Sequence, residues 1–135
     1  IFMTNQKLIK KAAAIIRPKK MKDGLCADVG CALISEKGNL YLGVCAATGS
    51  NAICAERMAI GAMIADGEYK IKKIVGVWKD EAGVVYVPPP CGNCRQFMRE
   101  VDESNLENTE VVLDKNKSVK LKELLPYYDW WKKQG

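Results

Sequence analysis

The chain has 135 residues, 48% of them hydrophobic and 27% charged, a balance typical of a globular protein. This length favours one domain over residues 1–135, with a core large enough to fold without disulfide or metal staples. No apolar run approaches the roughly 18 residues of a membrane-spanning helix, and the first residues lack the features of a signal peptide. We therefore expect a cytoplasmic protein with no membrane partner.

The charge and the residue types exclude several kinds of site. The formal net charge is +5, and the excess lysines fall in short clusters, which we interpret as a solvated surface rather than a nucleic-acid interface. Histidine is absent, so Ser-His-Asp and Cys-His catalysis are excluded, and any zinc needs sulfur or carboxylate ligands. Six cysteines without a secretion signal indicate reduced thiols.

Apolar periodicity and turn residues predict a series of helices and strands. Thr4 caps a first helix that ends before Pro18, and the helix beginning at Cys54 is apolar on nearly all sides, which predicts burial. Strands alternate with helices, which predicts an α/β fold with a sheet covered on both faces. In chain order the predicted elements are a helix at 4–17, strands at 27–35 and 40–45, a helix at 54–65, strands at 71–78 and 84–87, a helix from 91, a strand at 109–113 and a helical stub at 121–125.

Two short cysteine motifs each open a predicted helix. The first is Cys54-Ala55-Glu56-Arg57, and the second is Pro90-Cys91-Gly92-Asn93-Cys94. A helix N-terminus stabilises thiolates through its free amides and its partial positive charge. Three protein ligands leave the fourth zinc position open, as in a catalytic rather than a structural site. We therefore predict that Cys54, Cys91 and Cys94 hold a catalytic Zn²⁺.

Glu56 stands in the first turn of the same helix, two residues after Cys54. It is too close along the chain to be a comfortable fourth ligand, yet near enough to reach a water on the metal. We expect it to move protons as a general acid and base. Arg57 is expected to offset the negative charge of the thiolates, and Arg95, beside Cys94, to donate a hydrogen bond to the metal ligands.

These motifs resemble those of the cytidine deaminase family. Two further segments also resemble the family: its first strand is matched by Val29-Gly30-Cys31-Ala32-Leu33, and its C-terminal end by Leu124-Leu125-Pro126. The resemblance implies a three-layer α/β/α fold with a mixed five-stranded sheet, Zn²⁺ on the three cysteines and Glu56 as the proton shuttle. It also implies the reaction, hydrolytic deamination of the cytosine amino group of a free nucleoside, cytidine or deoxycytidine. The candidate substrate contacts before and within the motifs are Cys45, Ala47, Ala55 and Pro90.

The segment before the first motif departs from the family pattern. Nucleoside-specific members carry an Asn-x-Glu pair there that binds the ribose, whereas this chain has Cys45-Ala46-Ala47 and no glutamate. In this respect, and in Trp130-Trp131 after Leu-Leu-Pro, the chain resembles the blasticidin-S deaminase branch. A modified cytosine nucleoside such as blasticidin S is therefore the alternative substrate.

The C-terminal tail leaves two interpretations open. Family members are commonly tetramers in which a tail or loop of one subunit completes the site of a neighbour. The resemblance therefore implies a homotetramer in which Tyr128 and Trp131 contact the substrate of a neighbouring subunit. The alternative is that these aromatic residues pack on their own domain.

Two functions of another kind share the same motifs. One is a non-catalytic zinc module that binds nucleic acid through its lysines, which requires a fourth protein ligand, with Cys45 as the candidate. The other is a polynucleotide deaminase. Nucleotide and polynucleotide members of the family tend to have histidine where this chain has Cys54, so the resemblance favours a free nucleoside over a nucleic acid.

Overall fold

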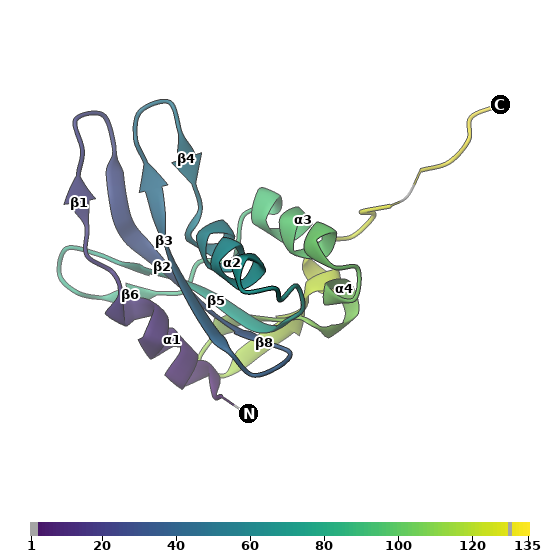
Figure 1. Ribbon diagram of the computed structural model, residues 1–135, viewed down its shortest axis with the longest axis horizontal. Helices are drawn as coiled ribbons and strands as arrows, with labels where there is room; N and C mark the ends of the chain where they lie inside the picture. Colours follow the sequence, from purple (N-terminus) through teal and green to yellow (C-terminus); the bar gives the residue numbers. More distant parts are fainter. Residues whose placement is uncertain (1–2, 130) are drawn as a thin grey trace.

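The computed structural model describes residues 3–129 and 131–135, so Trp130 lies outside the described residues. Figure 1 shows a central sheet with α1 on one face and α2, α3 and α4 on the other. The elements are α1 (Asn5–Ala14), β1 (Lys19–Lys20), β2 (Leu25–Ser35), β3 (Leu40–Ala47), β4 (Ala52–Ile53), α2 (Ala55–Ala65), β5 (Ile71–Lys79), β6 (Val85–Tyr86), α3 (Gly92–Val101), α4 (Asn105–Asn108), β7 (Glu110–Asp114), β8 (Lys117–Lys120) and the 3₁₀ helix η1 (Leu121–Leu124). The predicted three-layer α/β/α arrangement is confirmed.

The sheet is mixed, as predicted, but within the described residues it has eight strands rather than five. Its order is β4-β3-β2-β5-β7-β8, with β1 beside β2 and β6 beside β5. The pairing of β5 with β7 is parallel, and the other strand pairings among the described residues are antiparallel. The strands that sequence reasoning missed, β1, β4 and β8, are two to four residues long, too short to show an alternating pattern.

Each face of the sheet buries its own apolar cluster. On the α1 face, Leu8 and Ala12 pack with Ala32, Ile34 and residues of β5 and β7. On the α2 face the cluster is larger and includes two of the cysteines. Its fully buried members are Cys31, Leu33, Ala55, Ala59, Ile60, Met63, Ile71, Ile74, Cys94, Met98, Val111 and Leu121. Helix α2 buries one face against the sheet and contacts α3 on its flank. The predicted burial on nearly all sides is confirmed for that face only, because Gly61, Ala62 and Ala65 are exposed.

Helix α2 lies against the sheet at a glycine of β3. A Cβ atom at Gly43 would stand 2.3 Å from the Ala59 nitrogen and 2.7 Å from the Ala55 oxygen, so only glycine permits this approach. The first turn of α2 is thereby held close to the sheet. The residues that open this helix, Cys54 and Glu56, therefore occupy fixed positions above the strands.

Asn105 fixes the relation of α3 to the start of β5. Its side-chain amide donates to the Met98 oxygen at 2.9 Å and to the Tyr69 oxygen at 3.1 Å, while its oxygen accepts from the Ile71 nitrogen at 2.9 Å. The residue is almost completely buried, so these bonds satisfy groups that water does not reach. Helix α3, which begins immediately after Cys91, is thereby tied to the sheet.

The C-terminal segment extends away from the folded body in Figure 1. Trp131 is 87% exposed, and Tyr127 is 77% exposed. Among the described residues, every helix is too short or too polar to cross a membrane.

Candidate active site

Three cysteine sulfurs meet where α2 and α3 begin. Cys54 is the N-cap of α2 and Cys91 is the N-cap of α3, and neither helix start has a side-chain cap. The Cys54 Sγ lies 3.7 Å from the Cys91 Sγ, which lies 3.5 Å from the Cys94 Sγ. All three sulfurs lie within 4.8 Å of one another, and among the described residues they form the group suited to holding a metal ion. The predicted meeting of the two motifs is therefore observed.

The spacing of the sulfurs fits a tetrahedral zinc ion. Zinc–sulfur bonds of about 2.3 Å place the sulfurs of a tetrahedral site about 3.8 Å apart, close to the two distances observed here. Within the described part of the chain the cluster has three thiols and no fourth member, and the Cys45 thiol instead donates to the Asp28 carboxylate at 2.9 Å. Cys45 therefore does not close the site, and a fourth coordination position is left for water or substrate.

The thiols differ in how readily they lose their protons. Burial tends to raise the pKa of Cys91, but hydrogen bonds from the Cys94 backbone and from the neighbouring sulfurs bring it below its ordinary value. Burial raises the pKa of Cys94, and the negative charge of Glu56 adds to this effect. A divalent cation among the sulfurs would offset this penalty and deprotonate the thiols that bind it. The donor set therefore fits Zn²⁺.

Glu56 is a buried carboxylate beside the sulfur cluster. The residue is only 7% exposed. Its side chain lies over β5 at Gly76, where an added Cβ would stand 2.7 Å from the Glu56 Oε2. Burial raises the pKa of Glu56, while its own backbone N–H and the positive charge of Arg57 act in the opposite direction. A carboxyl group whose pKa is raised toward neutrality can both accept and return a proton.

Sequence reasoning missed Gly76, although the sequence carried a signal for it. An isolated glycine in an apolar strand often marks a close approach by another group, and Gly76 interrupts the run Ile74-Val75-Gly76-Val77-Trp78. The approaching group is the catalytic candidate Glu56.

Arg57 lies beside the sulfurs, as expected for a residue that offsets their charge. The hydrogen bond to the Cys54 sulfur contributes most to raising the pKa of the Arg57 guanidinium, and the Cys94 sulfur also contributes. One guanidinium nitrogen donates to the Ala52 oxygen at 3.3 Å. The Nε is buried and has no hydrogen-bond partner among the described residues. A negatively charged thiolate would accept a hydrogen bond from this Nε–H group.

Arg95 makes a different set of contacts from the one expected. Its Nε donates to the Pro90 oxygen at 2.8 Å, and one terminal nitrogen donates to the Leu124 oxygen at 3.1 Å. These bonds tie the segment before Cys91 to the end of η1. Arg95 therefore positions the second cysteine motif through the backbone, and its hydrogen bonds go to carbonyl groups.

The four predicted substrate contacts near the motifs fall around the cysteine cluster. Ala55 is fully buried in the first turn of α2, and Pro90 is buried immediately before Cys91. Cys45 and Ala47 lie near the end of β3, half-buried, and Ala47 pairs with Ala52 of β4. The strand β4 leads directly into Cys54. In the tail, the Tyr128 ring packs on α3 instead, with its centroid 4.6 Å from the guanidinium carbon of Arg99.

An apolar hollow lies beside the end of β5, where Val29 packs against the α2-face cluster and Val87 against the α1-face cluster. It encloses about 490 Å³ and is lined by Val29, Trp78, Tyr86, Val87 and Pro88. Trp78 follows Gly76 by two residues on β5, so both face the side that carries Glu56. The Trp78 and Tyr86 rings lie 5.3 Å apart between centroids and are 39% and 49% exposed. Such a surface can receive a flat ring or a neighbouring chain.

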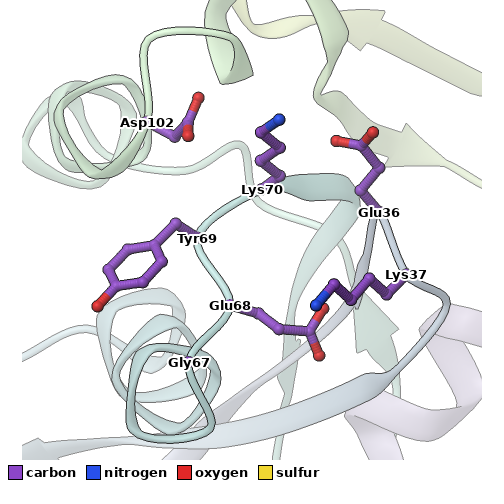
Figure 2. Close-up of a pocket in the computed structure, with 7 residues that line it drawn as sticks. All are labelled: Glu36, Lys37, Gly67, Glu68, Tyr69, Lys70 and Asp102. Carbon is purple, nitrogen blue, oxygen red and sulfur yellow. The ribbon is translucent and has the colours of Figure 1, made fainter.

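A second hollow, of about 390 Å³, lies at the opposite end of α2 from Cys54. Figure 2 shows its lining, which comes from the β2–β3 turn, the α2–β5 connection and the end of α3. The lining residues are Glu36, Lys37, Gly67, Glu68, Tyr69, Lys70 and Asp102. Glu68 accepts hydrogen bonds of 2.6 Å from both Asn39 and Tyr41. This carboxylate is therefore engaged within the protein, and the charged hollow is separate from the cysteine cluster.

Comparison with known families identifies the cysteine site. Residues 3–107 match the family described as the cytidine and deoxycytidylate deaminase zinc-binding region. The chain belongs to this family. The predicted family, its zinc cofactor and its hydrolytic deaminase activity are thereby confirmed, in agreement with the three clustered thiols. No curated protein sequence matches the chain.

Solved structures agree with the family assignment. The cytidine deaminase from Mycobacterium leprae matches with a TM-score of 0.72 and 26% identity, over 93% of this chain and 99% of that one. The cytidine deaminase from Burkholderia pseudomallei gives a TM-score of 0.68 and 28% identity, over 93% and 98%. The cytidine deaminase from Mycobacterium tuberculosis, at 21% identity and a TM-score of 0.70 over 93% and 97%, supports the fold alone.

Proposed function

We propose that the protein hydrolyses the amino group of a free cytosine nucleoside, giving the uracil nucleoside and ammonia. The observation that carries this proposal is the cluster of three thiols within 4.8 Å of one another, with the buried carboxylate of Glu56 in the adjoining first turn of α2. The relatives of known structure at 26% and 28% identity are cytidine deaminases, which supports cytidine or deoxycytidine as the substrate.

Cys54, Cys91 and Cys94 would hold the zinc ion, which, when bound, supplies a hydroxide nucleophile at neutral pH. Glu56 accepts the proton released from the attacking water and passes it to the ring nitrogen next to the reacting carbon. The water oxygen bonds to that carbon, and Glu56 then takes the second proton from this oxygen and gives it to the amino group, so the C–N bond breaks, the C=O bond of uracil forms and ammonia leaves. Burial over Gly76 holds the carboxylate in one place and limits its access to water. Arg57 offsets the negative charge of the three thiolates.

The test is ammonia release together with loss of cytosine absorbance on cytidine, deoxycytidine, cytosine and blasticidin S, with protein of measured zinc content. Glu56→Gln should keep its zinc while turnover falls at least about a hundredfold, the usual scale of a general acid–base contribution. Glu103→Gln, an exposed carboxylate at the end of α3 with an ion pair to Arg99, is the matched control and should turn over normally. Near-normal turnover of Glu56→Gln would remove Glu56 from the mechanism.

Blasticidin S remains the alternative substrate, since the Asn-x-Glu pair expected for ribose binding is absent from this chain. The same substrate panel separates the two. Binding of nucleic acid by a closed zinc module has less support, because Cys45 is bonded to Asp28 and is not part of the sulfur cluster. Deamination of a single-stranded oligonucleotide would instead indicate a polynucleotide substrate.

We also propose that the domain spans residues 1–135 and assembles as a homotetramer. Exposed apolar side chains at Leu42, Ile53, Trp78, Val85 and Tyr86 support the assembly, since such residues are typical of subunit contacts. The exposed Trp131 leaves the tail open to contact a neighbour. Light scattering that gives the mass of one chain would contradict the tetramer, and unchanged KM in Trp131→Ala would contradict a role for the tail at a neighbouring site. The cytoplasmic location stays a prediction.

A further inference from the structure

Strand β2 contains an irregularity close to the active site. Cys26 pairs with Ala46 of β3, and the next aligned pair is Gly30 with Val44. Three residues of β2 therefore lie opposite the single residue Cys45. One of the three, Ala27, has φ +62°, in the left-handed region that non-glycine residues rarely adopt. Strained bulges of this kind are frequent beside active sites, where they redirect a side chain.

The side chain that this bulge redirects is Asp28. In a regular strand, residue 28 would face the same side as Gly30, Ala32 and Ile34, which is the α1 side. Instead, the Asp28 Oδ1 lies 2.9 Å from the Cys45 Sγ. Cys45 packs against the cluster on the α2 face. The bulge therefore brings a carboxylate to the face of the sheet that carries Glu56 and the cysteines.

The Asp28 carboxylate is held in place yet keeps acceptor capacity. Burial raises the pKa of the Cys45 thiol, and the hydrogen bond to Asp28 adds to this effect, so the thiol stays protonated and donates. Among the described residues, the Cys45 thiol is the one group that donates a hydrogen bond to the Asp28 carboxylate. A carboxylate has about four acceptor positions, so several remain available. The residue is half-buried and can be reached from solvent.

Two strand pairings place Asp28 at the edge of the active site. Beyond Cys45, Ala46 pairs with Ile53, the residue before Cys54. On the other side of β2, Val29 pairs with Trp78, which lines the apolar hollow. Asp28 therefore lies beside the strand segments that lead to Cys54 on one side and to this hollow on the other.

We propose that Asp28 binds the sugar hydroxyl groups of the substrate, in the place where nucleoside-specific relatives are expected to use an Asn-x-Glu pair. The inference rests on the proposed deaminase function and adds to it a residue that selects a neutral, hydroxylated sugar. An anionic group on the sugar would be repelled by the carboxylate, whereas hydroxyl groups donate charge-assisted hydrogen bonds to it.

The test compares cytidine with 2′,3′-dideoxycytidine, which has the same base without the two hydroxyl groups. The wild-type protein should prefer cytidine in kcat/KM by about tenfold or more, the usual scale of hydrogen bonds to a charged group. Asp28→Asn should remove most of this preference, chiefly by raising KM for cytidine, and should leave dideoxycytidine within about twofold. Zinc content and the melting temperature establish that the variant is folded.

Asp23→Asn, on the exposed loop before β2, makes the same charge change and should retain the preference. Calorimetric binding of uridine and 2′,3′-dideoxyuridine to the wild-type protein provides a measurement that does not depend on turnover or on the variant folding. Equal wild-type affinity for the two, or an unchanged preference in folded Asp28→Asn, would overturn the role of Asp28. A wild-type protein that binds uridine selectively but deaminates no cytosine nucleoside would instead contradict the proposed function alone.

Discussion

At the residue scale, the position of the Glu56 carboxylate depends on a neighbour that has no side chain. Gly76 pairs with Cys31 in the middle of the sheet, so its backbone cannot move away from the helix above it. The space that a Cβ would need is occupied by the Glu56 Oε2, 2.7 Å away. Burial of the Glu56 carboxylate therefore depends on the absence of a Cβ atom at Gly76.

Gly76→Ala should disturb catalysis while leaving the metal site intact. The added methyl group would displace the Glu56 carboxylate, and a misplacement of about 1 Å can lower the rate roughly a hundredfold. Zinc content should be unchanged, because the three atoms nearest to the new methyl group all belong to Glu56 and none to a cysteine. Turnover and zinc content of the purified variant check this expectation.

Gly61→Ala is the control for that substitution. Gly61 lies in α2, is exposed, and a Cβ built there meets nothing within 4 Å. Alanine should raise the free energy of unfolding by up to about 1 kcal/mol through its helix propensity, with normal turnover. Equal turnover of the two variants would contradict the steric role of Gly76.

At the scale of elements, α2 is tied to the sheet at both ends. Its N-terminus carries Cys54, and its C-terminal connection carries Glu68, which accepts from Asn39 and from Tyr41 of β3. Hydrogen bonds from side chains, the largest contribution coming from Ser35, lower the pKa of the Glu68 carboxyl to about 2. The single proton of the Tyr41 hydroxyl is shared between Glu68 and an Asp66 carboxylate oxygen 2.5 Å away, and the contacts with Asp66 and Glu68 raise the pKa of Tyr41.

This lowered pKa predicts a dependence of stability on acid. A carboxylate whose pKa is lower in the folded chain stabilises it above the ordinary value of 4.5, and this stabilisation is lost as the pH falls toward about 2. Glu68→Gln should therefore melt below the wild-type protein at pH 7, and the difference should shrink at pH 3.5. Thermal unfolding at several pH values measures it.

Glu36→Gln changes another carboxylate of the same hollow, shown in Figure 2, and serves as the control. Among the described residues no hydrogen bond to the Glu36 carboxylate is observed, so this variant should melt close to the wild-type protein at pH 7. A Glu68→Gln deficit that persists unchanged at pH 3.5 would show that packing, and not the charge of the carboxylate, accounts for its effect.

At the scale of the whole molecule, the cysteine cluster joins parts of the chain that are distant in sequence. Cys54 follows β4, whereas Cys91 and Cys94 follow β6 and open α3. Cys94 is fully buried in the larger apolar cluster, so a metal at this point connects the core to both helix starts. A ligand that binds only the folded chain stabilises it according to its concentration relative to its dissociation constant.

Removal of zinc should therefore lower the melting temperature. Free zinc at a hundred times its dissociation constant contributes about 2.7 kcal/mol, which corresponds to roughly 5–10 °C for a chain of this size. Scanning calorimetry with and without a chelator measures the difference. Cys94→Ser should abolish the response to chelator, and a wild-type protein that melts at the same temperature in both conditions would contradict a bound metal.

The amino-acid sequence by itself was sufficient to identify the cysteine motifs, the family and the layered α/β class, because these depend on residue types at short spacings and on long apolar periodicities. It did not predict β1, β4 and β8, since two to four residues carry no readable period. Nor did it predict that Arg95 would bond to the carbonyls of Pro90 and Leu124, contacts that depend on where η1 ends.

The tertiary structure decided which groups share the active-site face. Local spacing indicated that Cys54, Cys91 and Cys94 have the chemistry of a zinc site, but their separation of 3.5–3.7 Å between neighbouring sulfurs results from the packing of α2 and α3. The space for Glu56 above Gly76 and the turn of Asp28 toward Cys45 come from strand register and from a bulge. These features depend on pairing between distant segments, which no single stretch of sequence specifies.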